Sequence, residues 1–182
     1  FRWFRTDLAC LESIHMVAIP NITILSGRYD TNSSTDDTIP SANEPFHERT
    51  VHNGMTFGLS AAGYDVRIRE TVHLGPGEFA LASTIEKFDM PPDLLAVVMQ
   101  IIVGTQGIAV QNTVLEPGWR GYLTLELTNH NHEELVTIEA GSPIAQVIFH
   151  RLEAPTEQPY QGRYQDQEAG PQPARYATKD DK

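Results

Sequence analysis

From residue 54 to residue 153 the chain consists of short runs of alternating apolar and polar residues, separated by turn residues. The separators are Gly-Pro-Gly, Pro-Pro, Pro-Gly and Gly-Ser-Pro segments. Short strands at regular spacing with such turns are typical of all-β barrels and jelly rolls. The pattern predicts an all-β domain with strands at Tyr64–Arg69, Glu78–Thr84, Leu94–Val103, Tyr122–Thr128, Leu135–Ile138 and Ala145–Arg151.

The two flanking regions follow other patterns. Apolar residues at helical spacing predict one short amphipathic helix within residues 1–19. Residues 27–50 are rich in Ser, Thr, Asp, Asn and Pro without an apolar period, which favours a long loop or an insertion. The end of the chain is rich in Gln, Gly and Pro, a composition typical of disordered termini, but its tyrosines argue for contacts. We therefore divide the chain into an N-terminal helix and loop, a barrel and a C-terminal arm, at 1–53, 54–153 and 154–182.

Composition and charge narrow the function. A length of 182 residues suits one domain. The net charge of −11 argues against a nucleic-acid surface, although a few local cations can still hold a small anion. No run approaches the roughly 18 apolar residues of a membrane span, and charges interrupt the first segment too often for a signal peptide. We expect a cytoplasmic protein without a membrane or nucleic-acid partner.

The chain has a single cysteine, Cys10. One cysteine cannot form an internal disulfide or supply the several thiolates of a zinc cage. His130 and His132 have a spacing that can hold a metal, but their polar turn favours a surface position. We therefore predict no protein-bound metal.

The strongest candidate for chemistry is Glu126. Alternation places Leu123, Leu125 and Leu127 on one strand face, and Thr124, Glu126 and Thr128 on the other. A carboxylate flanked by hydroxyls is suited to take a proton from an attacking water. A solvated Glu on an outer sheet face is the alternative that these residues leave open.

Four segments resemble the motifs of dUTPase-like proteins, in the family's order, and the third has the form typical of the dCTP deaminase branch. A fifth stretch, FALASTIEKFDMPPDLLAVV, also resembles the family's sequence between its first two motifs. The resemblance spans residues 54–176, and the four segments are SAAGYDVR (60–67), EPGWRGYLTLELTN (116–129), GSPIAQVIFH (141–150) and YQGRYQDQEAGP (160–171).

This resemblance implies a dUTPase-like β-barrel, a distorted jelly roll, that assembles as a homotrimer with sites at the subunit boundaries. It implies hydrolytic deamination of dCTP to dUTP without zinc, with Glu126 activating water and Mg²⁺ carried by the triphosphate. It assigns Glu116, which stands where the family has Asp, as a second catalytic candidate. It places the deoxycytidine or deoxyuridine nucleotide against Asp65, Arg67, Gln111, Asn112, Trp119, Gln146, Tyr160, Arg163, Tyr164 and Gln167.

The second motif of the family is missing. Its members carry Lys or Arg before Ser-Ser or Ser-Thr, and this chain has no Lys or Arg between Phe88 and Trp119. Three alternatives follow: other cations take over, the ligand carries fewer phosphates, or the protein is a catalytically weak nucleotide-binding or regulatory trimer. A dUTPase or a bifunctional deaminase–diphosphatase, with Glu116 or Asp65 directing water at phosphorus, is the alternative enzyme. Candidate replacement cations are Arg67, Arg69, Arg120, Arg163 and Arg175.

Overall fold

The computed structural model describes residues 23–26, 49–52, 54–101 and 106–176. The helix expected within residues 1–19 lies outside the described residues, as does most of the expected loop 27–50. The described part contains no α-helix, which agrees with the predicted all-β class. Its strands are β1 Thr23–Ser26, β2 Thr50–His52, β3 Met55–Leu59, β4 Tyr64–Arg67, β5 Val72–Leu74, β6 Phe79–Asp89, β7 Leu94–Gln100, β8 Ile108–Gln111, β9 Val114–Leu115, β10 Arg120–Asn129, β11 Val136–Ile138 and β12 Pro143–Arg151.

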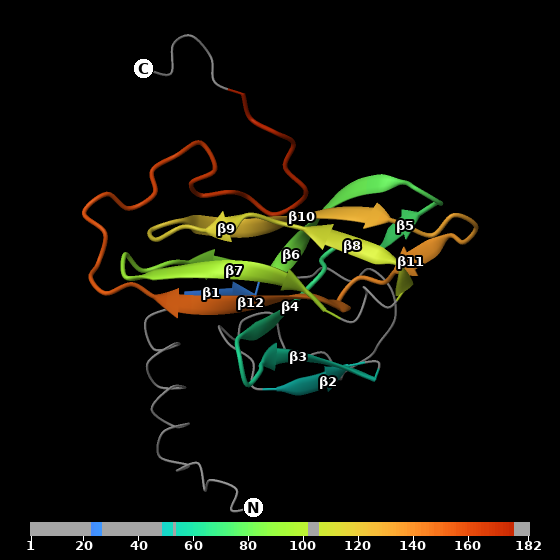
Figure 1. Ribbon diagram of the computed structural model, residues 1–182, viewed down its shortest axis with the longest axis horizontal. Helices are drawn as coiled ribbons and strands as arrows, with labels where there is room; N and C mark the ends of the chain where they lie inside the picture. The colour runs from blue at the N-terminus through green and yellow to red at the C-terminus, as the bar shows by residue number, and fades with distance from the viewer. Residues whose placement is uncertain (1–22, 27–48, 53, 102–105, 177–182) are drawn as a thin grey trace, which may run out of the picture.

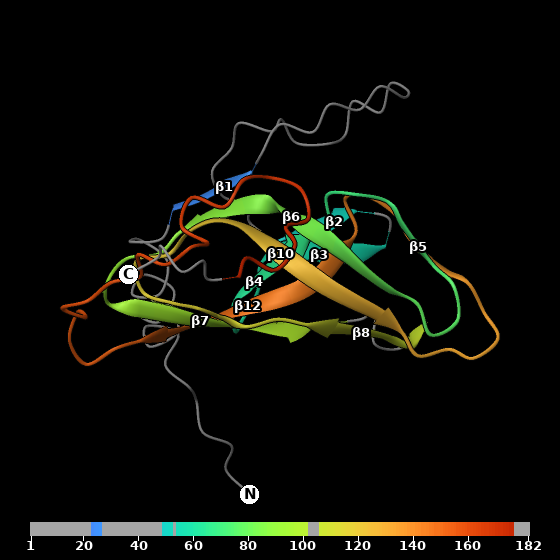
Figure 2. The ribbon, with the colours of Figure 1, turned by 90° about the horizontal axis from the view of Figure 1, so that it is seen from above.

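Two larger sheets and one small sheet make up the fold (Figures 1 and 2). The first has the order β1-β6-β10-β8, and the second has the order β2-β3-β4-β12-β7-β9. Strands β5 and β11 form the small sheet at one end of the molecule. All strand pairs are antiparallel, and neighbours in a sheet are often distant in sequence, as in β12 between β4 and β7. This is the jelly-roll type of arrangement that the turn spacing predicted.

A single core lies between the two larger sheets. It is built from alternate residues of the strands, for example Leu125 and Leu127 of β10, Tyr64 and Val66 of β4, and Phe88 of β6. Each of these side chains is buried, and full burial of one large apolar side chain contributes about 1.5–3 kcal/mol. The period-2 pattern is therefore the source of both the strands and their orientation.

Strand β6 differs most from the expected boundaries, since it ends at Asp89 and not at Thr84. The sequence after Thr84 reads Ile-Glu-Lys-Phe, which lacks a clean alternation because Glu86 is charged. In the structure Glu86 is buried, and its carboxylate is paired with Arg67 of β4 at 2.8 Å. An ion pair between two strands thus supports a charged residue inside a sheet.

The part of the chain that the structure describes contains no helix with the length and apolar character of a membrane span.

Candidate active site

Strand β10 presents Glu126 on the polar face that alternation predicted. Its neighbours Leu125 and Leu127 are buried, whereas Glu126 is exposed. In the register of the sheet, Glu126 lies opposite Leu81 of β6 and Gln111 of β8. A central strand with partners on both sides holds its backbone in place and so fixes the direction in which each side chain starts, which suits a catalytic carboxylate.

An irregularity in β6 shapes the sheet beside Glu126. The register with β10 shifts between the pairs Tyr122–Lys87 and Thr124–Ser83. At the shift, the Leu123 amide donates to the Thr84 hydroxyl at 3.1 Å in place of a backbone carbonyl. Bulges of this kind redirect side chains locally. Leu123 is buried, as predicted, and it also contributes to the cavity wall beside Thr124.

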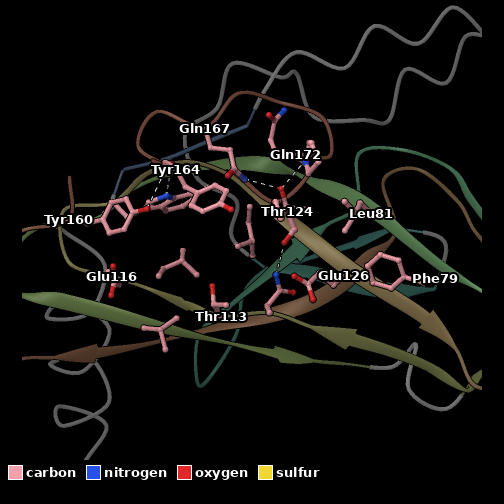
Figure 3. Close-up of a pocket in the computed structure, with 17 residues that line it drawn as sticks. Phe79, Leu81, Thr113, Glu116, Thr124, Glu126, Tyr160, Tyr164, Gln167 and Gln172 are labelled. Atoms are coloured by element: carbon pink, nitrogen blue, oxygen red, sulfur yellow. Dashed lines mark hydrogen bonds between the residues drawn. The ribbon is translucent and has the colours of Figure 1, made fainter. Parts of the chain in front are cut away.

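A cavity of about 780 Å³ lies over this part of β10 (Figure 3). The cavity brings together seven of the twelve candidate residues: Glu116, Glu126, Asn112, Trp119, Tyr160, Tyr164 and Gln167. Its size is within the range of pockets that bind small molecules. The remaining wall is mostly apolar or aromatic and consists of Phe79, Leu81, Thr113, Val114, Leu115, Leu123, Thr124, Gln172, Pro173 and Ala174.

The C-terminal arm closes one side of the cavity by hydrogen bonding to β10. Buried Gln167 donates from Nε2 to the Tyr122 carbonyl at 2.8 Å and to the Thr124 hydroxyl at 2.9 Å. The Gln172 backbone amide donates to the same hydroxyl at 3.3 Å. The arm runs so close to β10 that a Cβ on Gly121 would lie 2.8 Å from the Gln167 Cβ. The arm therefore packs as part of the domain, as its tyrosines suggested.

An ion pair outside the cavity adds to this docking. The Arg120 guanidinium donates to the Asp166 carboxylate, and both side chains are largely exposed. The hydrogen bond from Arg120, together with its positive charge, lowers the pKa of Asp166 below its usual value. Asp166 also adopts a positive φ of 58°, which is uncommon for a residue other than glycine. The turn of the arm thus combines an exposed ion pair to β10 with an uncommon backbone conformation at Asp166.

Asn112 connects β8 to the same wall. Its Nδ2 donates to the Thr124 carbonyl at 2.6 Å. Its Oδ1 is buried, and within the described part of the chain no group donates a hydrogen bond to it. A buried acceptor without a partner costs about 1–3 kcal/mol, so such an atom calls for an explanation.

Five of the candidate residues lie away from the cavity. Asp65 and Gln146 bind each other at 2.8 Å on β4 and β12, where burial raises the pKa of Asp65. Gln111 is exposed on β8, and Arg163 in the arm exchanges hydrogen bonds with the backbone and side chain of Arg175. These residues do not line the cavity of the single chain.

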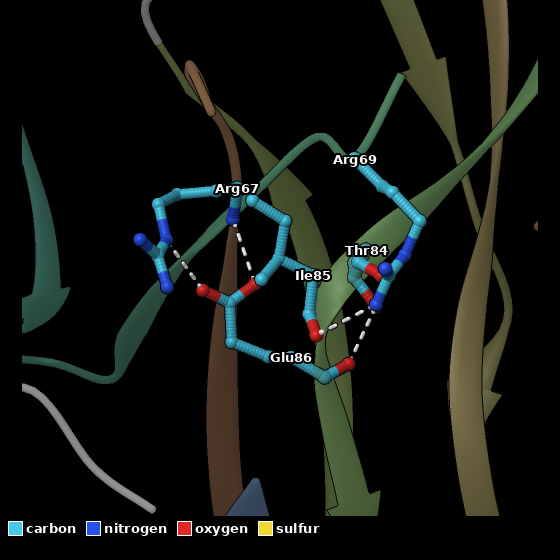
Figure 4. A network of polar contacts seen from close by, with 5 residues as sticks. All are labelled: Arg67, Arg69, Thr84, Ile85 and Glu86. Carbon is cyan, nitrogen blue, oxygen red and sulfur yellow. Dashed lines mark hydrogen bonds and ion pairs between the residues drawn. The ribbon is translucent and has the colours of Figure 1, made fainter. Parts of the chain in front are cut away.

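Arg67 is the fifth of these residues. It is buried against Glu86, and its backbone amide also donates to that carboxylate at 2.9 Å (Figure 4). Its guanidinium stacks on the Phe57 ring, with 4.2 Å between the guanidinium carbon and the ring centroid. This environment favours a structural function for Arg67, because its charge is already neutralised inside the domain.

The described cavity lining contains two carboxylates and no Lys or Arg. Arg69 donates to the Thr84 and Ile85 carbonyls and lies over the Tyr122 ring, and Arg120 is paired with Asp166. The described residues also hold no cluster of three or more His, Cys, Asp or Glu side chains. The described cavity wall of a single chain therefore offers no cationic side chain to bind the phosphates.

Thr124 and Gln172 are cavity residues that were not among the twelve candidate residues. Thr124 was identified as a neighbour of Glu126, but its use as the anchor of the arm depends on contacts across about 45 residues of sequence. The alternation of β10 was the available signal, because it placed Thr124 on the face of Glu126. Nothing local distinguishes Gln172 from the other glutamines of the arm.

Together, the antiparallel barrel and this cavity have the features of a dUTPase-like fold. A mutant dUTPase from phage phi11 of S. aureus aligns with a TM-score of 0.51, 14% identity, and coverage of 79% of this chain and 98% of that chain. The dUTPase of Staphylococcus bacteriophage 80alpha, solved with dUPNHPP, gives a TM-score of 0.50 at 18% identity, covering 79% and 89%. At these identities the likeness shows the fold.

The family follows from the sequence comparisons. Residues 42–152 match the family model described as dCTP deaminase-like. A dCTP deaminase of Campylobacter fetus is 33% identical over 159 residues, which cover 69% of this chain and 85% of that protein. A dCTP deaminase of Pyrococcus horikoshii is 33% identical over 138 residues, covering 67% and 83%. The chain belongs to the dCTP deaminase-like family.

Proposed function

We propose that this protein catalyses the hydrolytic deamination of dCTP to dUTP, with Glu126 activating the attacking water and without zinc. The observation that carries the proposal is the position of Glu126 in the wall of a cavity to which both β10 and the arm contribute. Membership of a family whose similar relatives are dCTP deaminases supports the choice of substrate.

The reaction needs one group that both accepts and returns a proton. Glu126 takes a proton from water while the water oxygen bonds to the ring carbon that bears the amino group. Glu126 then passes this proton to the amino nitrogen, the C–N bond breaks with its electron pair going to nitrogen, and ammonia leaves. The second proton of the water ends on the adjacent ring nitrogen of the uracil product. General acid–base catalysis of this kind contributes about 10²–10⁴-fold in rate.

The aromatic and apolar wall suits a planar pyrimidine. Trp119 is fixed by donation from its Nε1 to the Tyr164 carbonyl at 2.9 Å, and the Tyr164 amide in turn donates to the Tyr160 hydroxyl at 3.2 Å. These rings line the cavity together. Rings held in this way bind a flat base with little further loss of side-chain freedom.

The triphosphate requires positive charge from elsewhere. Mg²⁺ would arrive with the nucleotide as part of the substrate, where it neutralises part of the phosphate charge. We further propose a homotrimer in which a second copy covers the open side of the cavity. Exposed Phe79 and Val114, which line the cavity, support such a cover.

The first prediction concerns Glu126. We expect Glu126→Gln to lower the rate of ammonia release from dCTP by at least 10²-fold, because the amide cannot accept the proton of water. Glu133→Gln is the matched control, since it removes an equal charge from an exposed turn outside the cavity. Both variants are assayed for ammonia and pyrophosphate at saturating dCTP and Mg²⁺. Deamination at the unchanged rate in Glu126→Gln would refute the assignment.

Two other products would point to the alternative functions. Pyrophosphate release favours a dUTPase or bifunctional enzyme, for which Glu116 in the cavity wall is the available carboxylate. Nucleotide binding without either product favours a catalytically weak regulatory protein, which the lack of cations in the described cavity lining supports. Ammonia alone is the result expected for the deaminase.

A further inference from the structure

The Asn112 amide oxygen is the one buried side-chain polar atom in the described residues that has no hydrogen-bond partner. The orientation of the amide is fixed by its other end. A carbonyl only accepts hydrogen bonds, so the Thr124 carbonyl at 2.6 Å must face the NH₂ group of Asn112. The opposite end of the amide is therefore an acceptor, and it stays an acceptor at every pH at which the protein is folded.

Asn112 and the proposed catalytic Glu126 belong to the wall of one cavity. Gln111 is the register partner of Glu126, so the next residue, Asn112, lies level with the segment between Thr124 and Glu126. The hydrogen bond from Asn112 to the Thr124 carbonyl agrees with this position along β10. Figure 3 shows Thr124 and Glu126 close together on the cavity wall.

The chemistry of deamination brings an N–H donor to this region. Water activated by Glu126 has to approach the amine-bearing carbon to within about 3–3.5 Å, and the amino nitrogen is one bond from that carbon. The substrate amino group therefore lies within a few ångströms of the carboxylate. The amino group donates hydrogen bonds, whereas the carbonyl that replaces it in the product only accepts them.

We propose that the Asn112 side-chain oxygen accepts a hydrogen bond from the exocyclic amino group of the pyrimidine and thereby selects cytosine over uracil. This inference rests on the proposed function and adds a specificity-determining residue to it. The amino group of cytosine donates a hydrogen bond to the unsatisfied acceptor. Uracil instead places its carbonyl oxygen, a second acceptor, next to it. Asn112 also favours product release, because the bond is lost when ammonia leaves.

The test measures binding, so that it does not depend on turnover. In a Glu126→Gln background, dCTP and dUTP are titrated calorimetrically with Mg²⁺, and the ratio of the two dissociation constants is compared with that after a further Asn112→Leu change. We expect dCTP to bind about 10–100-fold more tightly than dUTP with Asn112 present, and the ratio to approach one with leucine. Asn131→Leu is the matched control: its Nδ2 also donates to a carbonyl, that of Gln106 at 2.7 Å, but it lies outside the cavity lining.

A second measurement changes the nucleotide and leaves Asn112 in place, so a folding defect of a variant cannot affect the result. The 2-pyrimidinone deoxynucleoside triphosphate has hydrogen in place of the amino group and neither donates nor accepts there. We expect it to bind more weakly than dCTP and more tightly than dUTP.

The outcomes separate this inference from the proposed function. Equal loss of dCTP and dUTP affinity in Asn112→Leu, or an unchanged ratio, overturns the inference and assigns Asn112 to the sugar or to the wall. In that case deamination by Glu126 still stands. If none of the three nucleotides binds at millimolar concentration, the proposed function fails as well.

Discussion

At the scale of single residues, the Arg67–Glu86 ion pair decides how β4 and β6 are held together. Both side chains are buried, with exposures of 6% and 0%. Removing one partner leaves a buried charge uncompensated, and this typically costs about 3–5 kcal/mol. We expect Glu86→Leu to lower the free energy of unfolding by this amount, as measured by urea denaturation.

The double variant Arg67→Met with Glu86→Leu should recover part of the loss, since apolar side chains of similar volume often replace a buried pair without cost. The Arg67 backbone amide, which donates to Glu86, stays unpaired and accounts for the rest. Asp93→Asn is the control: it breaks the more exposed ion pair with Arg151 and should change stability by about 0–1 kcal/mol. A loss in Glu86→Leu no larger than that in Asp93→Asn would contradict the structural assignment of Arg67.

At the scale of elements, the docking of the arm on β10 depends on the absence of a side chain at residue 121. A Cβ there would meet the Gln167 Cβ and backbone nitrogen at 2.8 Å each. We expect Gly121→Ala to displace the arm and to abolish protection of the Tyr122 amide, which donates to the Gln167 carbonyl at 3.0 Å. Hydrogen exchange followed by mass spectrometry measures this protection.

Gly77→Ala separates steric displacement from backbone strain. Gly77 has a positive φ of 71°, and a Cβ there would meet nothing within 4 Å. This variant should carry the strain of a non-glycine residue and leave exchange in the arm unchanged. Equal exchange in both alanine variants and in the unchanged protein would mean that the arm tolerates the Cβ.

At the scale of the whole molecule, the proposed homotrimer accounts for the apolar rim of the cavity. Phe79 is 54% exposed although it lines the cavity, and exposed apolar patches often mark interfaces. We expect light scattering to give three times the chain mass of 20.3 kDa. Phe79→Asp should shift the mass towards that of one chain, because a charge would be buried without a partner.

Leu135→Asp is the matched control, since Leu135 is 63% exposed and does not line the cavity. It should leave the mass unchanged. A monomer in the unchanged protein would refute the trimer. A trimer that survives Phe79→Asp would place the interface on another face.

The all-β class and the face on which Glu126 lies follow from the amino-acid pattern alone. Period-2 alternation is local and decides which side chains of a strand point to the core, so Leu125 and Leu127 were predicted correctly. The ordered motifs indicated the family, which the match over residues 42–152 shows. Six of the seven candidates that line one cavity also came from those motifs, whereas Asn112 lies just before the third motif.

Which polar residues lie together depends on tertiary contacts that the amino-acid pattern does not specify. The neutralisation of Arg67 by Glu86, the anchoring of Gln167 on Thr124 and the unsatisfied oxygen of Asn112 all depend on contacts between strands and segments distant in sequence. Periodicity specifies the face of a residue but not its neighbour on the next strand, because strand order and register are set by the packing of the whole domain.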